Sequence, residues 1–454
     1  MHFTRRLLDR GLPVTLAFVV IPAAGVVASC ASDDDDDGAR TEEGLDAASL
    51  DGSPKDAGSE PAVASDAGVV DASPLPIVCG AGACATALVT TLETDSDRGE
   101  GFCALLRDGT VACWGASSSG RLGRGEDAGS GSRPARVDGL VKVVALDHTC
   151  ALDEDGATWC WGTGPFLRDD AGAVSTERVP VKLPIPPATH VGVGSTAACA
   201  AVDGGILCWG ENLWGQVGPR PAMPFAGTHP PRQVALPPGA PVRRIAVGYA
   251  TFVLREDGAM VTWGYNPSLG RVSSLFPDPY PAPMSVPGVS TVDVAGPDVC
   301  ATAGGTAYCW GAVVPKSTEE PIPYPPIGRA LPEPVVVPEP VVQIATTSTT
   351  RTLATDRGII QPYRWCATTL SGAVYCVGFN ESGQDGSGNK DYVHEPVRVV
   401  ALPEPVASVP TTWNTTCALT TSGKVYCWGS NFYGQLGNGK SRGESLVPEE
   451  VVLP

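Results

Sequence analysis

The sequence has little of what catalysis or a helical architecture usually requires. It contains five histidines and 6% aromatic residues, and past its first thirty residues it has no long helix-periodic segment free of glycine and proline. It also lacks the HExxH, G-x-S-x-G and Walker motifs, so metalloprotease, serine hydrolase and P-loop chemistry have no support. We therefore expect a protein that is not an enzyme, with no catalytic residue, no cofactor and no metal ion.

Positive charge is also scarce. The 454 residues carry a net charge of −18, and residues 31–78 hold thirteen acidic side chains against Arg40 and Lys55, which leaves about −9 from Cys79 onward. Because duplex binding needs a basic surface, we expect no nucleic-acid partner. Residues 31–78 are rich in Asp, Ala, Gly and Ser and cannot bury enough apolar surface to fold, so they predict a flexible acidic tether.

Glycine, proline and cysteine are abundant instead, with 54, 43 and 15 copies. Such glycine and proline contents are typical of many short strands joined by tight turns, which predicts an all-β protein. Zinc sites favour C-x2-C pairs, whereas most cysteines here stand nine or ten residues from their neighbour. The cysteines therefore indicate disulfides and an oxidising compartment.

The N-terminus has the pattern of an export signal. Arg5, Arg6 and Arg10 precede an apolar run from Leu12 to Val27 that is short for a membrane span. The run ends in VASC, which resembles the bacterial lipobox and implies cleavage before Cys30 and lipidation of its thiol. An ordinary signal peptide, or an uncleaved anchor in which this cysteine is incidental, remains the alternative.

These features divide the chain into three parts. We expect a lipoprotein signal peptide at residues 1–29, a lipid-anchored tether at residues 30–78 and a repeat domain at residues 79–454. The expected location is the bacterial cell envelope, with the two residues after the lipobox favouring the outer membrane. Contact with the membrane would be through the lipid anchor alone.

One phrase of twelve or thirteen residues recurs seven times and determines the fold class. Its copies start at Cys103, Cys150, Cys199, Phe252, Cys300, Cys366 and Cys417, at intervals of 47, 49, 53, 48, 66 and 51 residues. A period near 50 is typical of a propeller or a repeat array. Each copy predicts a β-hairpin, because strand residues flank a turn dipeptide such as Asp-Gly, Gly-Gly or Ser-Gly.

The cysteines of each copy are placed for cross-strand bridges. Cys103 and Cys113 are equidistant from the predicted turn at Asp108, and opposed residues of antiparallel strands are close enough for a disulfide. The fourth copy has lost both cysteines together, with Phe252 and Thr262 in their places. The predicted bridges are Cys103–Cys113, Cys150–Cys160, Cys199–Cys208, Cys300–Cys309, Cys366–Cys376, Cys417–Cys427 and, across a Gly-rich spacer, Cys79–Cys84.

The segments between copies complete a recognisable repeat. A P-x-x-V strand and an apolar strand separate the hairpins, and glycine-rich turns such as WGENLWGQVG and WGSNFYGQLGNG follow them. The composite resembles the regulator-of-chromosome-condensation repeat over about residues 85–454. The resemblance implies an all-β, seven-bladed β-propeller. We expect its first blade to be completed by the C-terminal strand Leu446–Pro454, which would close the ring, and a proline-rich excursion at Pro315–Pro340.

The predicted function is binding or scaffolding without catalysis. The tryptophans of the WG motifs predict packing anchors between blades. Trp214, Phe432 and Tyr433 occupy variable positions of the glycine-rich turns and are candidate partner-binding residues, with packing against a neighbouring blade as the alternative. The expected partner of this monomeric disc is an unidentified protein or a component of the cell envelope.

Other functions stay open at this point. The family includes a guanine-nucleotide exchange factor, but export and disulfides argue against that role here. Inhibition of an exported enzyme is the main alternative, because a secreted propeller of related fold inhibits a β-lactamase. Binding or cleavage of envelope polysaccharide is a further alternative, and it would require carboxylates and aromatic side chains on one face.

Overall fold

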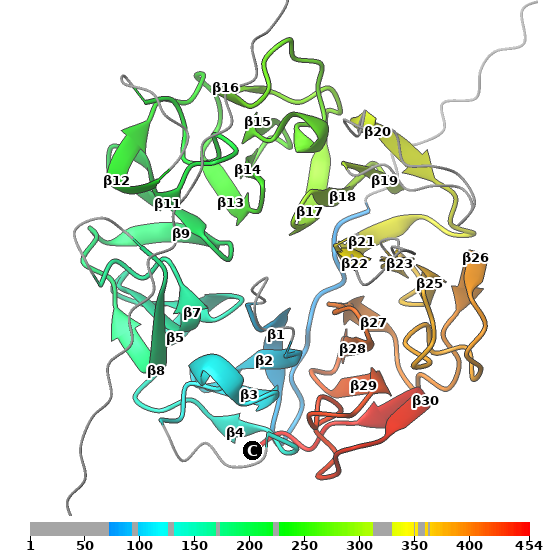
Figure 1. Cartoon of the computed structure of the whole chain (residues 1–454). Coiled ribbons are helices and arrows are strands. Elements are labelled where there is room, and N and C mark those ends of the chain that lie inside the picture. The colour runs from blue at the N-terminus through cyan, green and yellow to red at the C-terminus, as the bar shows by residue number, and fades with distance from the viewer. Residues whose placement is uncertain are drawn as a thin grey trace, which may run out of the picture. The chain divides into compact units, whose positions relative to one another are not determined.

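The computed structural model describes residues 72–92, 99–125, 131–168, 173–220, 227–311, 329–348, 350–352, 359–361 and 364–454. The predicted signal peptide, Cys30 and most of the tether lie outside these residues. Within the unit Asp66–Pro454, the described strands form seven four-stranded antiparallel sheets around a central axis (Figure 1). The predicted seven-bladed β-propeller is therefore confirmed. No helix in the described part of the chain is long and apolar enough to cross a membrane.

Each blade uses four strands that follow one another in the sequence, except for one insertion. The first blade contains β1 (Ala85–Thr90), β2 (Gly101–Leu106), β3 (Val111–Gly115) and β4 (Ala135–Arg136). The second contains β5 (Val143–Asp147), β6 (Cys150–Asp153), β7 (Thr158–Gly164) and β8 (Ser175–Lys182). The third contains β9 (Ala188–Val193), β10 (Ala197–Val202), β11 (Gly205–Glu211) and β12 (Thr228–Val234).

The remaining four blades repeat this arrangement. The fourth contains β13 (Val242–Val247), β14 (Ala250–Arg255), β15 (Met260–Gly264) and β16 (Asp278–Pro283). The fifth contains β17 (Val289–Ala295), β18 (Asp298–Ala303), β19 (Thr306–Gly311) and β20 (Arg329–Val335). The sixth contains β21 (Val341–Thr346), β24 (Trp365–Thr369), β25 (Val374–Gly378) and β26 (Val393–Arg398). The seventh contains β27 (Val406–Ser408), β28 (Thr415–Thr420), β29 (Val425–Ser430) and β30 (Glu444–Glu450).

The recurring phrase forms the second and third strands of each blade, as predicted. Cys103 lies opposite Cys113 in the β2–β3 pair, and Phe252 lies opposite Thr262 in the blade without cysteines. The turn glycines have the positive φ that such turns need, with 76° at Gly109. All seven predicted disulfides are present among the described residues. The six inside hairpins join Cα atoms 4.1–4.2 Å apart.

Ring closure differs from the prediction. The C-terminal strand β30 pairs with β29 in the last blade and does not complete the first, which has its own four strands. The P-x-x-V strand belongs to the hairpin before it, because the glycine-rich turn folds it back onto that hairpin's second strand. The first and last blades join instead through shared apolar packing, in which Phe102 and Leu88 belong to the same cluster as Leu419 and Val451.

The WG tryptophans anchor six of the seven blades to a neighbouring blade, as predicted. In six blades the buried indole N–H donates to a backbone carbonyl oxygen in the turn between the third and fourth strands of the adjacent blade, at 2.7–3.0 Å. The pairs are Trp114 with Gln435, Trp161 with Arg121, Trp209 with Pro165, Trp263 with Gln216, Trp310 with Ser268 and Trp428 with Gln384. The sixth blade has Val377 at this position, without an indole.

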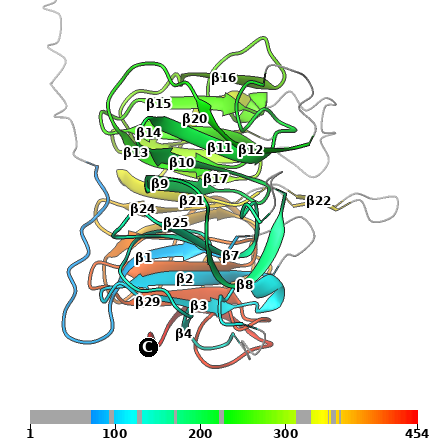
Figure 2. The same ribbon diagram turned by 90° about the vertical axis from the view of Figure 1, so that its left-hand side faces the viewer.

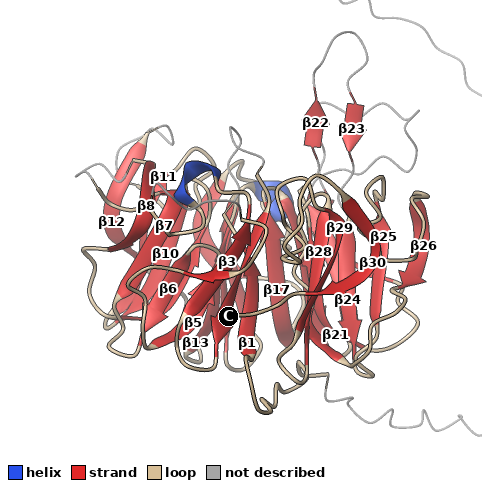
Figure 3. Cartoon of the chain, turned by 90° about the horizontal axis from the view of Figure 1, so that it is seen from below, coloured by secondary structure: helices blue, strands red, loops and turns tan. Residues whose placement is uncertain are grey.

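The predicted proline-rich excursion is partly wrong. Residues 329–335 form β20, the outer strand of the fifth blade, and residues 312–328 lie outside the described part. Extra chain length is instead found in the sixth blade, where the hairpin of β22 (Thr350–Thr352) and β23 (Ile359–Gln361) is inserted between β21 and β24. Figure 3 shows this hairpin projecting from one face of the disc.

The two faces of the disc differ. We call the face with the first-to-second and third-to-fourth strand connections the loop face, and the opposite one the hairpin face. Residues 72–84, here called the strap, run along the hairpin face (Figure 2). The Val78 N–H donates to Thr421 O at 2.7 Å, and the guanidinium of Arg107 donates to Gly80 O at 2.8 Å. The described chain therefore enters the disc on the face opposite the inserted hairpin.

Candidate functional site

An aromatic cluster lies on the loop face where the third and fourth blades meet. The Trp214 ring stacks on Tyr249 with centroids 5.5 Å apart, and its edge contacts Tyr265 at 4.8 Å. Tyr265 also contacts Phe276 at 5.5 Å. Trp214 comes from the β11–β12 turn, whereas the three other rings come from the β13–β14 and β15–β16 connections of the next blade. Neighbouring blades thus build one surface that neither builds alone.

Much of this cluster remains open to solvent. The Phe276 side chain is 63% exposed, and the adjacent leucines Leu213 and Leu275 are 52% and 44% exposed. Burial, together with the nearby Asp298 carboxylate, raises the pKa of Tyr265, so its phenol stays protonated and can donate. We call Leu213, Trp214, Tyr249, Tyr265, Leu275 and Phe276 the aromatic surface. Exposed aromatic groups of this kind mark interaction sites.

The loop that carries Phe276 is held by internal hydrogen bonds. The Asn266 side-chain amide donates to Leu275 O at 2.6 Å and to Ser273 O at 3.0 Å. The Arg271 guanidinium pairs with the Asp278 carboxylate at 2.8 Å, and both side chains are buried. The ring of Phe276 is therefore presented by a braced loop, which reduces the entropy lost when a partner binds.

The three residues predicted to bind a partner are not brought together. Trp214 is half-buried and packs on the neighbouring blade, whereas Phe432 and Tyr433 are 60% and 47% exposed in the last blade. Their two rings contact each other at 4.9 Å and no ring of the aromatic surface. Trp214 alone joins a larger cluster, and partner binding by any of the three remains a proposal.

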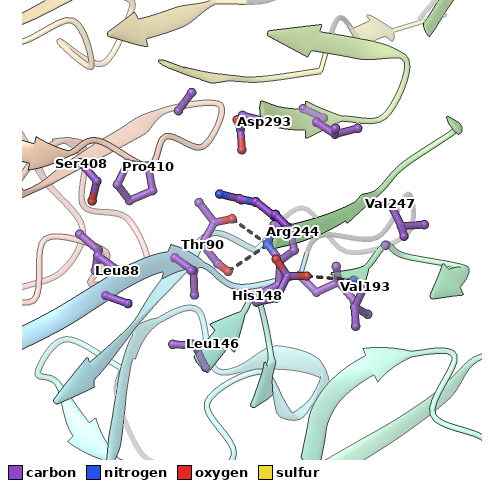
Figure 4. A pocket seen from close by; sticks show the side chains of 18 of the residues that line it. Leu88, Thr90, Leu146, His148, Val193, Arg244, Val247, Asp293, Ser408 and Pro410 are labelled. Atoms are coloured by element: carbon purple, nitrogen blue, oxygen red, sulfur yellow. Dashed lines mark hydrogen bonds between the residues drawn. The ribbon is translucent and has the colours of Figure 1, made fainter. Parts of the chain in front are cut away.

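A cavity of about 870 Å³ follows the propeller axis and is here called the central channel. Its wall is formed by the innermost strands of the blades, and Figure 4 shows side chains that line it. Leu88 and Leu146 supply apolar wall, while Arg244 and Asp293 supply charge. Pro74, Leu75 and Ile77 of the strap also line it, at the hairpin-face end.

Several polar side chains on this wall bond one blade to the next. The Asp147 carboxylate accepts the Val193 N–H at 2.9 Å, and the Asp293 carboxylate accepts the Thr346 N–H at 2.8 Å. The His148 imidazole lies 3.1 Å from the Thr90 hydroxyl. Similarly, the Gln343 carbonyl oxygen accepts the Val409 N–H at 2.9 Å. These groups are engaged in holding the ring together.

Arg244 is different from these groups. Its guanidinium makes no hydrogen bond or ion pair with any residue that the structure describes, and Figure 4 shows it extending into the channel between Thr90 and Asp293. The neighbouring Arg243 is tied down, because it donates to Val289 O at 3.0 Å and to Ser290 O. Burial raises the pKa of Asp293, and the positive charge of Arg244 partly opposes that shift.

Sequence reasoning missed most of these residues. Tyr249 and Phe276 lie outside the glycine-rich turn motif, and Tyr265 occupies a variable position of it directly after Trp263-Gly264. Arg244 and Asp293 lie on strands without a distinctive pattern. No sequence signal places residues of different blades side by side. Among the described residues no cluster of three or more His, Cys, Asp or Glu side chains is arranged to hold a metal ion.

Comparison with known proteins agrees with the repeat pattern. Models of the regulator of chromosome condensation (RCC1) repeat match residues 406–435 and 422–454. The chain is 28% identical to the ultraviolet-B receptor UVR8 of Arabidopsis thaliana, over 74% of this chain and 77% of the receptor. It is 26% identical to the E3 ubiquitin-protein ligase HERC2 of Homo sapiens over 73% of this chain, but that match spans only 7% of the ligase.

Solved structures show the same architecture. The structure of Kap60 bound to yeast RCC1 (Prp20) matches with a TM-score of 0.59 and 20% identity, over 75% of this chain and 83% of the other. Prp20p of Saccharomyces cerevisiae matches with a TM-score of 0.57 and 19% identity, over 75% and 85%. Fold and repeats together define a seven-bladed β-propeller stapled by disulfides. The chain carries RCC1 repeats within residues 406–454 and is similar to RCC1-like propellers over about three quarters of its length.

Proposed function

We propose that this chain is a non-catalytic binding propeller of the cell envelope that engages a protein partner through the aromatic surface. The disulfides indicate an exported protein. The supporting relatives include a receptor, and Prp20p is described by its binding to Gsp1p and histones, so discs of this architecture bind proteins. The predicted lipid on Cys30 would attach the chain to the envelope, with the outer membrane as the expected location.

The aromatic surface is chosen as the binding surface because it lies on the face opposite the strap. The described chain begins at Ala72 on the hairpin face, whereas the aromatic surface lies on the loop face. The strap occupies the hairpin face and leaves the aromatic surface uncovered. The exposed rings of that face come from a braced loop and a rigid disc, as a preorganised interface requires.

A capture experiment with matched variants tests this proposal. The full chain, its Phe276→Ala/Leu213→Ser variant and its Phe432→Ala/Tyr433→Ala variant are each used to capture proteins from envelope extract. We expect one partner to be retained by the wild type and by the blade-seven variant, and lost from the aromatic-surface variant. Equal melting temperatures would show that the loss is not due to unfolding. Retention by the aromatic-surface variant with loss from the blade-seven variant would assign binding to Phe432 and Tyr433 instead.

Lipidation has a separate test. Mass spectrometry of the chain isolated from membranes should find a diacylglyceryl group at Cys30 and no residues before it. Replacement by Cys30→Ala should release the chain from the membrane fraction without changing partner capture. A chain that stays membrane-bound after this replacement would contradict the anchor.

A further inference from the structure

We propose that the central channel is a binding site for a small monocarboxylic acid, held by the guanidinium of Arg244. The site is distinct from the partner surface proposed above, because it lies on the axis of the disc and is built around Arg244. Of the residues of the aromatic surface, only Tyr249 also lines the cavity. The shape of the channel and the hydrogen bonds of its wall support this site.

The guanidinium of Arg244 is a charged group of this wall that makes no hydrogen bond or ion pair with any residue that the structure describes. Asp147, Asp293 and His148 each bond to an adjacent blade, and Arg243 donates to backbone carbonyls. Arg244 has no such partner among the described residues and is exposed within the channel. A guanidinium offers five N–H donors in a planar fork that fits a carboxylate through two parallel hydrogen bonds. The Arg244 guanidinium can therefore bind the carboxylate of a ligand, because no carboxylate of the described residues is hydrogen-bonded to it.

The surrounding charges limit the ligand to one negative charge. Asp293 lies close enough for Arg244 to affect its ionisation, and Asp147 lies on the same wall. Two carboxylates near one guanidinium repel a dianion such as phosphate or a dicarboxylate more strongly than a monocarboxylate. The rest of the wall mixes apolar side chains such as Leu88 with hydroxyl groups such as Ser408, which suits a small organic molecule.

The size and ends of the channel agree with a small ligand. A cavity of about 870 Å³ falls within the range of small-molecule sites. The strap lines the hairpin-face end through Pro74, Leu75 and Ile77, and it is fixed there by the Val78 hydrogen bond and the Cys79–Cys84 disulfide. The ligand would enter from the loop face, where Gly248 and Gly296 line the other end.

Calorimetric titration of the full chain tests the site. D-glucuronate, L-lactate and benzoate are titrated as monocarboxylates of differing polarity, with D-glucose as the carboxylate-free match of glucuronate. Each is used up to about 10 mM, which mostly fills a site with a Kd of about 1 mM. We expect at least one monocarboxylate to bind and glucose not to bind. If none of the three acids binds the wild type, the proposal is wrong.

Two adjacent arginines supply the matched variants. Arg244→Gln should weaken binding by about tenfold or more, because the charged bidentate pair is lost. Arg243→Gln should bind like the wild type, because that guanidinium is held by Val289 O and Ser290 O. Equal affinity of the wild type and Arg244→Gln for the carboxylate would show that Arg244 does not bind it. Circular dichroism should show both variants folded.

A third variant tests the charge argument. Asp293→Asn removes one negative charge near Arg244 and keeps an oxygen that can accept the Thr346 N–H. We expect the carboxylate affinity to rise by about twofold to tenfold, since repulsion of the anion decreases. If Asp293 had a purely structural role, its replacement would not increase the affinity for the carboxylate. Weaker binding by Asp293→Asn would contradict the proposed repulsion between Asp293 and the bound anion.

Discussion

The carboxylate of Glu100 bonds to Asn414 across 314 positions of sequence. One carboxylate oxygen accepts the Asn414 backbone N–H at 2.9 Å and its side-chain amide at 2.8 Å, and the other accepts the Thr415 hydroxyl at 2.8 Å. Glu100 precedes β2 of the first blade, whereas Asn414 directly precedes β28 of the last blade and Thr415 begins that strand. The carboxylate is buried, so the junction that closes the ring contains a fully desolvated polar contact.

Replacing Glu100 should weaken this junction. Glu100→Ala removes the acceptor of the two Asn414 N–H groups and of the Gln435 side-chain amide, while the Thr415 hydroxyl keeps Ser430 O. This should lower the free energy of unfolding by about 3 kcal/mol. Urea unfolding followed by tryptophan fluorescence measures the change. The exposed Glu154→Ala variant is the control and should change it by less than about 0.5 kcal/mol. Equal effects of the two variants would show that the closing contact is not a stabilising one.

The inter-blade tryptophan bonds give a second prediction. Trp161→Phe keeps an aromatic ring but leaves Arg121 O without its donor in the buried junction of two blades. We expect a loss of about 1–3 kcal/mol in the free energy of unfolding. Trp159→Phe, two residues earlier in the same strand, should cost less, because that indole and its acceptor Asp153 are partly exposed to water. The reverse order in urea unfolding would contradict the anchoring role.

The blade without a disulfide supplies an internal control for reduction. In reducing conditions that leave the disc folded, amide exchange should become faster in hairpins whose bridge is cleaved. The β14–β15 hairpin should change least, since Phe252 and Thr262 replace its cysteines. Hydrogen exchange read by mass spectrometry resolves the separate blades. A uniform response over all hairpins would mean that the bridges do not stabilise their own blades.

The loss of folding stability in acid should depend in part on Glu404 and Glu339, which occupy corresponding positions in adjacent blades. The Ser422 hydroxyl, and then Lys424, lower the pKa of Glu404, and Ser371 and Tyr375 lower the pKa of Glu339 in the preceding blade. These pKa values are lower in the folded chain than in the unfolded chain, where the ordinary value is about 4.5. The ionised carboxylates therefore stabilise the fold fully above about pH 4.5, and this stabilisation is lost as the pH falls through the pKa values of the folded chain. The contribution of each carboxylate is small, since both are partly exposed.

Two variants test the contribution of Glu404. Glu404→Gln should lower stability at neutral pH and make its decline below pH 4.5 shallower, and Ser422→Ala should reproduce part of that change. Urea unfolding from pH 3 to pH 7 measures the slope. An unchanged slope in both variants would show that this carboxylate does not contribute to acid denaturation.

Local pairing was determined by the sequence alone. The partner of Cys103 is ten residues away, and a two- or three-residue turn fixes which residues of a hairpin lie opposite each other. For the same reason the six hairpin bridges could be predicted, and the loss of both cysteines at Phe252 and Thr262 was informative. The seventh bridge, Cys79–Cys84, was predicted because these two cysteines remained across a Gly-rich spacer. The seven copies also gave the number of blades, because one hairpin builds the centre of each sheet.

Contacts between blades were decided by the tertiary structure. The sequence placed β30 in the first blade, but a strand can pair with either neighbouring hairpin, and only the path of the turn before it assigns it to β29. The cluster of Trp214 with Tyr265, and the approach of Arg244 to Asp293, join segments tens of residues apart. Such contacts depend on the rotation from one blade to the next, which is set by side-chain packing and leaves no periodic signal in the sequence.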